Sequence, residues 1–339
     1  MSWSGRAIRE RGMTLVEMLV VVAIIGLLLA LAVPALIRAR AAARAAACAN
    51  NLRQLGIGLH AYHQTHRTLP YGAGPGDMIL KDRRRRFSAL SLLLPYIGYE
   101  NVYNLINFQL PPFWPDPNYN ASTTALAGPN ATAALSRIGL FLCPSDGGHE
   151  RLRRAGHPWG QTNYRTCMGS TWDIYAEDGL FPAFRGYSLD EVADGLSQTA
   201  AIAEKLVGDG SEAVVTWNRD FFPLMFDAGS SEGLREHCRQ LDIMRYQNQY
   251  HDSDTGQNWL EANPNWTRYN HLDTPNQKSC KNRWLTTFGS LLAPTSNHGG
   301  YVHVLFADGS VHKITNDIQL DVWRALGTIN GEESVDLNF

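Results

Sequence analysis

Charge is scarce in this sequence, and neither sign dominates. Of the 339 residues, 18% are Asp, Glu, Lys or Arg, and 32 acidic against 30 basic side chains give a formal net charge of −2. Binding to nucleic acid phosphates requires an excess of Lys and Arg, so this balance gives no support for nucleic acid as a partner. The low charge, with 30 Gly, 16 Pro and 9 Trp, favours a loop-rich β domain over a helical one.

Two familiar functional patterns are incomplete. Ser197 lies near Asp194 but lacks the Gly-x-Ser-x-Gly context of a hydrolase nucleophile, so we interpret it as a turn-capping hydroxyl. The stretch 251–256, HDSDTG, resembles an oxygen-ligand calcium loop only in part, because the spacing and closing Glu of an EF-hand are missing. We therefore predict no enzyme activity, no metal site and no cofactor, and bound calcium is an alternative that the sequence does not support.

The N-terminal region holds a long uncharged stretch. From Leu15 to Val33 the only ionisable side chain is Glu17. About nineteen helical residues at 1.5 Å each nearly match the thickness of a bilayer core, which predicts a transmembrane helix over residues 13–35 and the lipid bilayer as a partner. Arginines lie on both sides of the stretch, so the positive-inside rule chooses no orientation.

The Gly12–Met13 junction precedes this apolar stretch. Cleavage there would leave the helix on the mature protein, unlike cleavage of a secretory signal peptide. Met13 would become the first residue and Glu17 the fifth, one helical turn from the new amine. A lone carboxylate inside a membrane costs about 2.5 kcal/mol, so it implies a partner. We predict that this partner is the new amine, within one chain or between chains.

The segment from Gly12 to Glu17, GMTLVE, followed by an apolar helix, resembles the prepilin-type cleavage and methylation segment of type IV pilins and type II secretion pseudopilins. The resemblance implies that prepilin peptidase removes residues 1–12 and that Met13 is methylated, although phenylalanine is commoner at this position. It also implies that Glu17 guides assembly with other pilin-like subunits. The N-terminus would lie in the cytoplasm and the head outside the inner membrane, where it would meet exported cargo. A generic anchor with a chance Gly and Glu is the alternative.

Residues 36–68 continue the helix as the soluble half of a spine. The segment is rich in Ala and Arg, which form helices well. One apolar stripe, with spacings of three and four, predicts a packed face: Cys48, Leu52, Leu55, Leu59 and Tyr62. From Thr14 to about His66 the helix would be roughly 80 Å long. Pro34 predicts a kink, and Pro70 predicts the end of the helix.

The remainder, residues 69–339, is expected to form a β-rich head with an insertion at about 209–285. Near its end, Val302, Val304 and Phe306 alternate before Asp308-Gly309, which predicts a hairpin over residues 301–314 closed by a two-residue type I′ turn.

Nine residues separate His298 from Asp308. The frame resembles the H-x9-DG motif that closes a large bacterial family of prepilin-like proteins of unassigned function. Several other segments match the same family: Cys48-Ala-Asn-Asn-Leu, Cys143-Pro-Ser-Asp, Asp194-Gly-Leu-Ser with Glu204 after it, and Tyr269-Asn-His-Leu with Pro275-Asn and Cys280.

A hairpin strand would hold His298 and Asp308 about 20 Å apart. We therefore interpret His298-Gly299-Gly300 as a loop that needs positive φ, and Asp308-Gly309 as the turn. A metal or ligand site at these residues remains the alternative.

Five cysteines remain. The extracytoplasmic head implied by the resemblance permits disulfides. Cys48 lies on the inner face of the spine, and Cys143 follows a predicted buried strand over 140–142. We predict the pairs Cys48–Cys143 and Cys238–Cys280, with Cys167 free, although the sequence leaves other connectivities open.

Together these features predict an α+β, pilin-like fold: a long N-terminal helix packed on a mainly antiparallel β head with short helices. The predicted function is a pseudopilin-like structural subunit of a type II secretion or type IV pilus-like assembly. One alternative is a membrane-anchored surface protein that binds carbohydrate or another ligand, suggested by Trp217, Trp259, Trp266 and Trp284. A second is an envelope hydrolase built around His298 and Asp308.

Overall fold

A computed structural model describes residues 15–74, 86–110, 112, 130–147, 153–154, 157–176, 178–211, 213–282 and 289–331. The chain divides into two compact units, residues 1–44 and 45–339, which are described separately. Helix α1 (Leu15–His66) begins in the first unit and ends in the second. The head carries mixed, mostly antiparallel sheets and short helices, so the predicted α+β, pilin-like class is confirmed.

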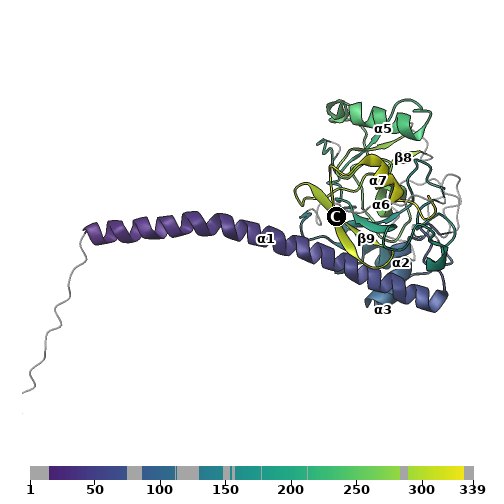
Figure 1. The fold of residues 1–339 in the computed structure, drawn as a ribbon, viewed down its shortest axis with the longest axis horizontal. Coiled ribbons are helices and arrows are strands. Elements are labelled where there is room, and N and C mark those ends of the chain that lie inside the picture. Colours follow the sequence, from purple (N-terminus) through teal and green to yellow (C-terminus); the bar gives the residue numbers. More distant parts are fainter. Residues whose placement is uncertain are drawn as a thin grey trace, which may run out of the picture. The chain divides into compact units, whose positions relative to one another are not determined.

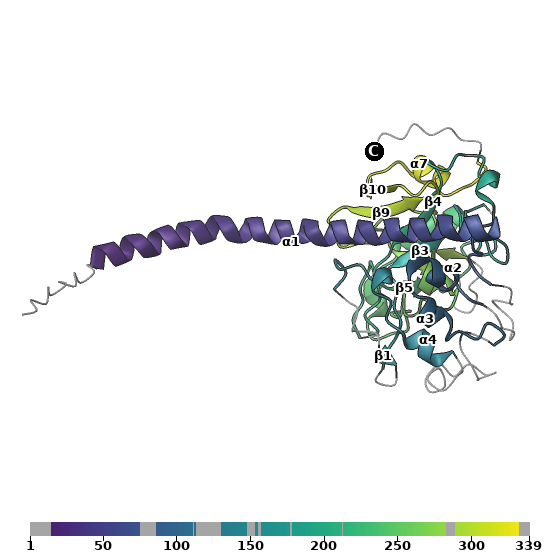
Figure 2. The ribbon, with the colours of Figure 1, turned by 90° about the horizontal axis from the view of Figure 1, so that it is seen from below.

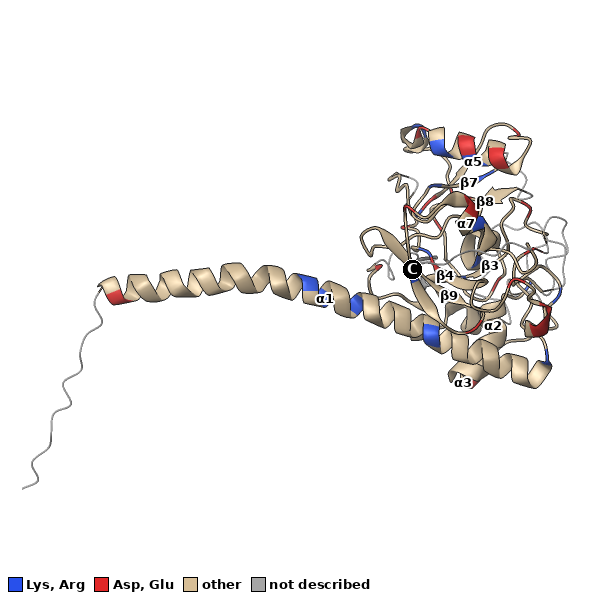
Figure 3. Cartoon of the chain, viewed as in Figure 1, with Lys and Arg blue, Asp and Glu red and all other residues tan. Residues whose placement is uncertain are grey.

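In the first unit, the apolar side chains of α1 are exposed. Leu15 is 79% exposed, Leu27 64% and Ile37 62%. This part of the helix is long and apolar enough to cross a membrane, and none of its most apolar window is buried in the protein. Figure 3 shows the uncharged stretch between an acidic residue at the helix start and the first basic residues. The helix continues through Pro34.

In the second unit, α1 buries the predicted stripe. Tyr62 packs against the same core, and the buried residues of the helix are Cys48, Ala49, Leu52, Leu55, Gly56, Gly58 and Leu59. The helix ends at His66, where Arg67 takes a left-handed conformation (φ 61°) and donates its N–H to the His63 carbonyl at 2.8 Å. The helix therefore ends four residues before Pro70, through a left-handed cap.

Two glycines let other segments approach α1 closely. A Cβ on Gly56 would lie 2.9 Å from Leu305 Cδ1 and 3.4 Å from Gly309 Cα, and a Cβ on Gly58 would lie 2.5 Å from Ile97 Cγ2. These glycines therefore serve close packing between the helix and the head.

The central sheet has five strands in the order β10-β9-β4-β3-β6. Its strands are β3 (Tyr164–Cys167), β4 (Ala200–Glu204), β6 (Arg268–Tyr269), β9 (Tyr301–Phe306) and β10 (Val311–Thr315). Only β3 and β6 pair in parallel; the other three pairs are antiparallel. The predicted hairpin is confirmed by the antiparallel pairing of β9 and β10.

The second half of α1 covers one face of this sheet, and α7 (Leu320–Ala325) packs on the other (Figures 1 and 2). Strand β9 shows the alternation. Leu305 belongs to the core cluster beneath α1, whereas Val302, Val304 and Phe306 pack in the cluster that contains Trp323 of α7. The period-two pattern in the sequence therefore separates the two cores.

A smaller sheet has the order β5-β7-β8, formed by Phe221–Pro223, Ser279–Lys281 and Ser290–Leu291. Beside it pack α5 (Ser231–Gln240) and η4 (Ile243–Tyr246), and α6 (Pro264–Thr267) leads directly into β6. The stretch 209–285 therefore contributes to both sheets and is integral to the head.

The remaining elements are short: α2 (Ala89–Leu93), η1 (Leu94–Ile97), α3 (Glu100–Tyr103), α4 (Ala131–Leu135), η2 (Gly139–Phe141), η3 (Leu189–Glu191), and a two-stranded ribbon of β1 (Arg153–Arg154) and β2 (His157–Pro158). The strand predicted over 140–142 was wrong. Leu140 and Phe141 form a 3-10 turn, and the N–H of Leu142 bonds back to the Gly139 carbonyl at 3.1 Å instead of joining a sheet.

Candidate functional site

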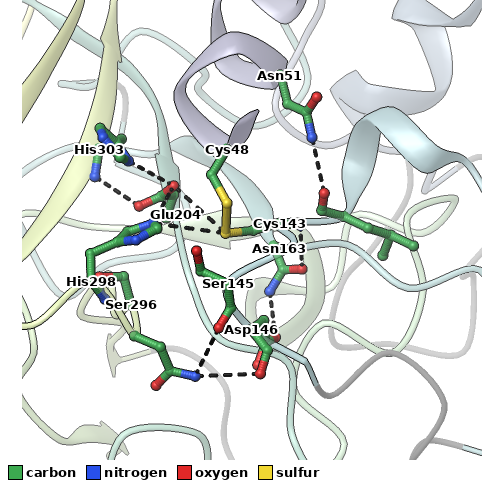
Figure 4. The surroundings of a disulfide bond; sticks show 12 residues. Cys48, Asn51, Cys143, Ser145, Asp146, Asn163, Glu204, Ser296, His298 and His303 are labelled. Atoms are coloured by element: carbon green, nitrogen blue, oxygen red, sulfur yellow. Dashed lines mark hydrogen bonds and ion pairs between the residues drawn. A yellow bond between two sulfur atoms is a disulfide. The ribbon is translucent and has the colours of Figure 1, made fainter. Parts of the chain in front are cut away.

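The candidate site lies at one end of the central sheet, where α1, β4, β9 and two loops meet (Figure 4). Cys48 comes from the buried stripe of α1, and Glu204 is the last residue of β4. Because Ala203 pairs with Val304 in antiparallel register, Glu204 and His303 are cross-strand neighbours. His303 shares a face of β9 with Leu305, so Glu204 and His303 lie on the face of the sheet that α1 covers.

Both predicted disulfides are confirmed. Cys48 and Cys143 are joined across 95 positions of sequence, and Cys238 and Cys280 across 42. All four residues are at most 4% exposed. Cys167 is free and buried, as predicted. Burial raises the pKa of its thiol to about 12, so it stays protonated at neutral pH.

Two histidines hold the buried carboxylate of Glu204. Nε2 of His298 lies 3.1 Å from Oε1, and Nδ1 of His303 lies 3.0 Å from the same oxygen; the His303 backbone N–H donates to Oε2 at 2.8 Å. Since an ionised carboxylate only accepts, these ring nitrogens carry protons. Burial alone would raise the pKa of Glu204, but the hydrogen bonds from His298 and His303 outweigh it and the pKa is lowered. Glu204 is therefore ionised.

This group touches the disulfide. Cys143 Sγ lies 3.9 Å from Glu204 Oε1 and 3.8 Å from His298 Nε2. A disulfide sulfur carries no proton, so these are contacts and not donated hydrogen bonds. The potential ligand atoms of Cys48, Cys143, Glu204 and His298 all lie within 4.8 Å of one another. Four segments distant in sequence therefore bring two sulfurs, an imidazole and a carboxylate together.

The Cys143-Pro-Ser-Asp loop is anchored on both sides of the cysteine. Asn163 accepts the Cys143 backbone N–H at 2.9 Å and donates to Asp146 at 2.6 Å. Asp146 also forms an ion pair with Arg219 at 2.6 Å, and Asn51 of α1 donates to the Leu142 carbonyl at 2.9 Å. These bonds hold Cys143 in place beneath α1.

The structure does not bring His298 and Asp308 together. The His298 side chain is 2% exposed and belongs to the Glu204 group at one end of β9. Asp308 follows the other end, where its Oδ1 accepts the N–H of Ser310 at 2.8 Å and the Ser310 hydroxyl at 2.7 Å. The two residues of the H-x9-DG frame therefore have separate local roles.

The predicted type I′ turn was wrong, although the hairpin is present. Leu305 pairs with Val311, and the Phe306 N–H bonds to the Ser310 carbonyl at 2.9 Å, which leaves Ala307, Asp308 and Gly309 as a three-residue loop. Gly309 has φ 89°, but Asp308 is not among the residues with positive φ, and a type I′ turn needs two. The Gly309 N–H bonds to the Phe306 carbonyl at 3.0 Å, so the left-handed glycine completes a longer loop. Gly299 and Gly300, with φ 73° and 110°, take positive φ as predicted.

Other residues considered from the sequence have structural roles. In the calcium-like stretch, Asp252 forms an ion pair with Lys281 at 2.7 Å, and Asp254 accepts from Asn265 at 3.3 Å. Trp259 and Trp266 are 0% and 3% exposed, while Trp217 is 45% exposed. Trp284 lies outside the described residues.

The roles of Glu204 and His303 were not predicted, although Glu204 lies in a matching family segment. The sequence does contain a signal for each. Glu204 is the one charged residue in the fully buried strand AAIAE, and His303 occupies an alternating position of β9 that faces the core. A charge at the end of a buried strand requires a partner, but the sequence alone did not identify which residues supply it.

The predicted processing site, Gly12 and Met13, lies outside the described residues. Glu17 lies in the first turn of α1. Because the resemblance places Glu17 five positions after the cleavage point, the helix would begin within one turn of the mature N-terminus.

Two family models match the chain. Residues 8–33 match the prokaryotic N-terminal methylation motif, and residues 38–321 match the family described as protein of unknown function (DUF1559). No curated protein and no solved structure matches significantly. The second match covers most of the chain, and the first is specific to prepilin-type proteins. The chain therefore belongs to the DUF1559 family and is a prepilin-like protein of unassigned function.

Proposed function

We propose that this protein is a non-enzymatic, pseudopilin-like structural subunit of a type II secretion or type IV pilus-like assembly in the inner membrane. The observation that carries the proposal is the position of Glu17 in the methylation-motif segment, as the one ionisable side chain between Leu15 and Val33. Prepilin peptidase would release residues 1–12 on the cytoplasmic side, and the head would fold outside, where its two disulfides form readily.

The exposed apolar surface of α1 supports assembly through the membrane. Its side chains from Leu15 to Ile37 are extensively exposed, so they contact lipid or neighbouring helices. The carboxylate of Glu17 would pair with the amine of Met13 on an adjacent subunit, which removes an unfavourable isolated charge from the membrane. Charge pairing sets the register between subunits, and apolar packing supplies the contact area.

The structure favours this proposal over the two alternatives. A carbohydrate platform needs several exposed aromatic rings, but of the three described tryptophans in the stretch 209–285, Trp259 and Trp266 are buried and Trp217 alone is exposed. A hydrolase built on His298 and Asp308 needs them side by side, but they belong to separate hydrogen-bonded groups.

The first test is the mass of the chain purified from native membranes, with and without prepilin peptidase. We expect a chain that begins at Met13 and carries one methyl group. Gly12→Ala should block processing. Gly26→Ala is the matched control, since a Cβ at Gly26 meets nothing within 4 Å. An uncut chain in the presence of active peptidase would overturn the proposal and favour a simple membrane anchor.

The second test measures assembly. A photo-crosslinking amino acid at Leu19 should trap dimers in native membranes. Glu17→Gln should reduce this yield by on the order of 50-fold, because it leaves the Met13 amine of the adjacent subunit as an unpaired charge, which costs about 2.5 kcal/mol in the membrane. Glu236→Gln, an exposed carboxylate on α5, is the control. Equal yields from both variants would contradict a role for Glu17 in assembly.

A further inference from the structure

We propose that the reduced form of this protein binds one zinc ion between Cys48, Cys143, Glu204 and His298. None of these groups is assigned a ligand role by the family or by the proposed assembly function. The inference rests on one cluster: four ligand atoms from four segments, all within 4.8 Å of one another. The disulfide and the metal site are alternative states of the same residues.

The spacing suits a tetrahedral ion. Zinc binds thiolate sulfur at about 2.3 Å, and imidazole nitrogen and carboxylate oxygen at about 2.0–2.2 Å, so neighbouring ligand atoms in a tetrahedron lie roughly 3.3–3.8 Å apart. Cys143 Sγ already lies 3.8 Å from His298 Nε2 and 3.9 Å from Glu204 Oε1, and the nitrogen and oxygen are 3.1 Å apart. The two sulfurs must separate, which follows when their covalent bond opens, and pairs of ligand atoms as far apart as 4.8 Å must close by about 1 Å.

The ligand types also favour zinc. Two thiolates and an imidazole are soft or borderline ligands, which prefer zinc over calcium or magnesium. The side chains of Glu204 and His298 are 2% exposed, Cys48 is fully buried and Cys143 is 4% exposed. Four protein ligands in a closed site are typical of structural zinc, with no position open for substrate.

Neighbouring side chains orient two of the ligands. His303 donates to both oxygens of Glu204, through Nδ1 at 3.0 Å and through its backbone N–H at 2.8 Å. The His298 ring stacks on Tyr301 with an interplanar angle of 13° and 5.4 Å between centroids. Such second contacts fix the direction of metal ligands before the ion binds. His303 is therefore a positioning residue for the site.

The conversion balances in atoms and electrons. A cellular dithiol donates two electrons to the Cys48–Cys143 bond and becomes a disulfide, which leaves two protein thiols. Zinc then displaces both thiol protons into solvent. The ion takes the place of the Nε2 proton between His298 and Glu204, this proton passes to solvent, and the bound imidazole carries one proton, on Nδ1. Oxidation of the two thiolates by a disulfide-forming partner reverses the process and releases zinc.

The test uses the full chain in detergent, reduced with a water-soluble phosphine, which takes oxygen from water and becomes a phosphine oxide. Cobalt is the spectroscopic probe. We expect one equivalent of tetrahedral cobalt with thiolate-to-cobalt charge-transfer absorption, displaced by one equivalent of zinc. The oxidised chain should show neither signal. A reduced chain that binds no cobalt would overturn the proposal.

The two disulfides supply a matched pair of controls. Cys48→Ser with Cys143→Ser should abolish the charge-transfer band, whereas Cys238→Ser with Cys280→Ser should retain it. The opposite result would place the metal at the other cysteine pair and overturn the assignment. Near-ultraviolet circular dichroism reports whether each variant is folded.

Variants that retain all cysteines keep the test decisive if a serine variant unfolds. Glu204→Gln and His298→Gln should each lower cobalt affinity at least tenfold and alter the visible spectrum, because each removes one ligand. His303→Gln should lower affinity by roughly 10- to 100-fold while retaining the thiolate band, as expected for a positioning residue. Unchanged affinity in both the Glu204 and the His298 variants would overturn the four-ligand site.

Discussion

The two disulfides should stabilise the head by different amounts, because they close loops of different length. The perturbation is a pair of double variants, Cys48→Ala with Cys143→Ala, and Cys238→Ala with Cys280→Ala. Sequence separations of 95 and 42 correspond to loop-closure contributions of about 4.7 and about 3.9 kcal/mol. All four cysteines are at most 4% exposed, so the cost of shortening buried side chains is similar and largely cancels.

The assay is guanidinium unfolding of the full chain in detergent, followed by tryptophan fluorescence. We expect both variants to lose several kcal/mol in the free energy of unfolding, and the first to lose about 0.7 kcal/mol more. Hydrogen exchange adds a positional readout: protection should fall over residues 45–66 in the first variant and over α5 in the second. A smaller loss for the first variant, with unchanged exchange over residues 45–66, would refute the loop-closure reasoning.

Two further predictions concern stability. Burial lowers the pKa of His271 to about 3 from 6.5, so below pH 6.5 the unfolded chain binds a proton that the folded chain does not. Relative to His271→Gln, the wild-type free energy of unfolding should therefore fall with decreasing pH, by up to about 1.4 kcal/mol per pH unit. The raised pKa of Asp220 contributes equally to the pH dependence of both proteins, so it cancels in this comparison. Parallel pH profiles of the two proteins would contradict the prediction. Gly58→Ala should destabilise the head by about 1–3 kcal/mol in the same denaturation assay, because its Cβ would lie 2.5 Å from Ile97 Cγ2. Gly26→Ala should leave head stability unchanged, and equal stability of the two variants would show that the Gly58 contact relaxes freely.

Local patterns in the sequence predicted much of the architecture. The helix over 15–66 follows from an uninterrupted apolar segment and an apolar stripe, and the stripe defined the face that the head covers. Alternation over 302–306 predicted a strand, and the structure then showed that both faces of this strand are buried. Repeating local preferences of this kind add along a segment, so they remain informative without knowledge of the partner.

Local sequence patterns predicted the structure less well where one or two residues determine the backbone conformation. Asp308-Gly309 indicates a turn in either case, but a two-residue loop and a three-residue loop differ only in which residues take positive φ and in strand register. Likewise, Leu140 and Phe141 are apolar enough for a strand, but within the described residues they join no sheet and form a 3-10 turn. Register and pairing are tertiary properties.

The sequence by itself predicted a segment long and apolar enough to span a membrane, the spine, the hairpin and the prepilin-type start, because each depends on contiguous residues. Only the tertiary structure decided that Glu204, His298 and His303 surround the Cys48–Cys143 bond. These contacts join residues 94 to 155 positions apart, and their proximity depends on strand order and on how α1 crosses the sheet. A buried charge must find its partners somewhere in the fold, but the physics of burial alone does not say which distant residues they are.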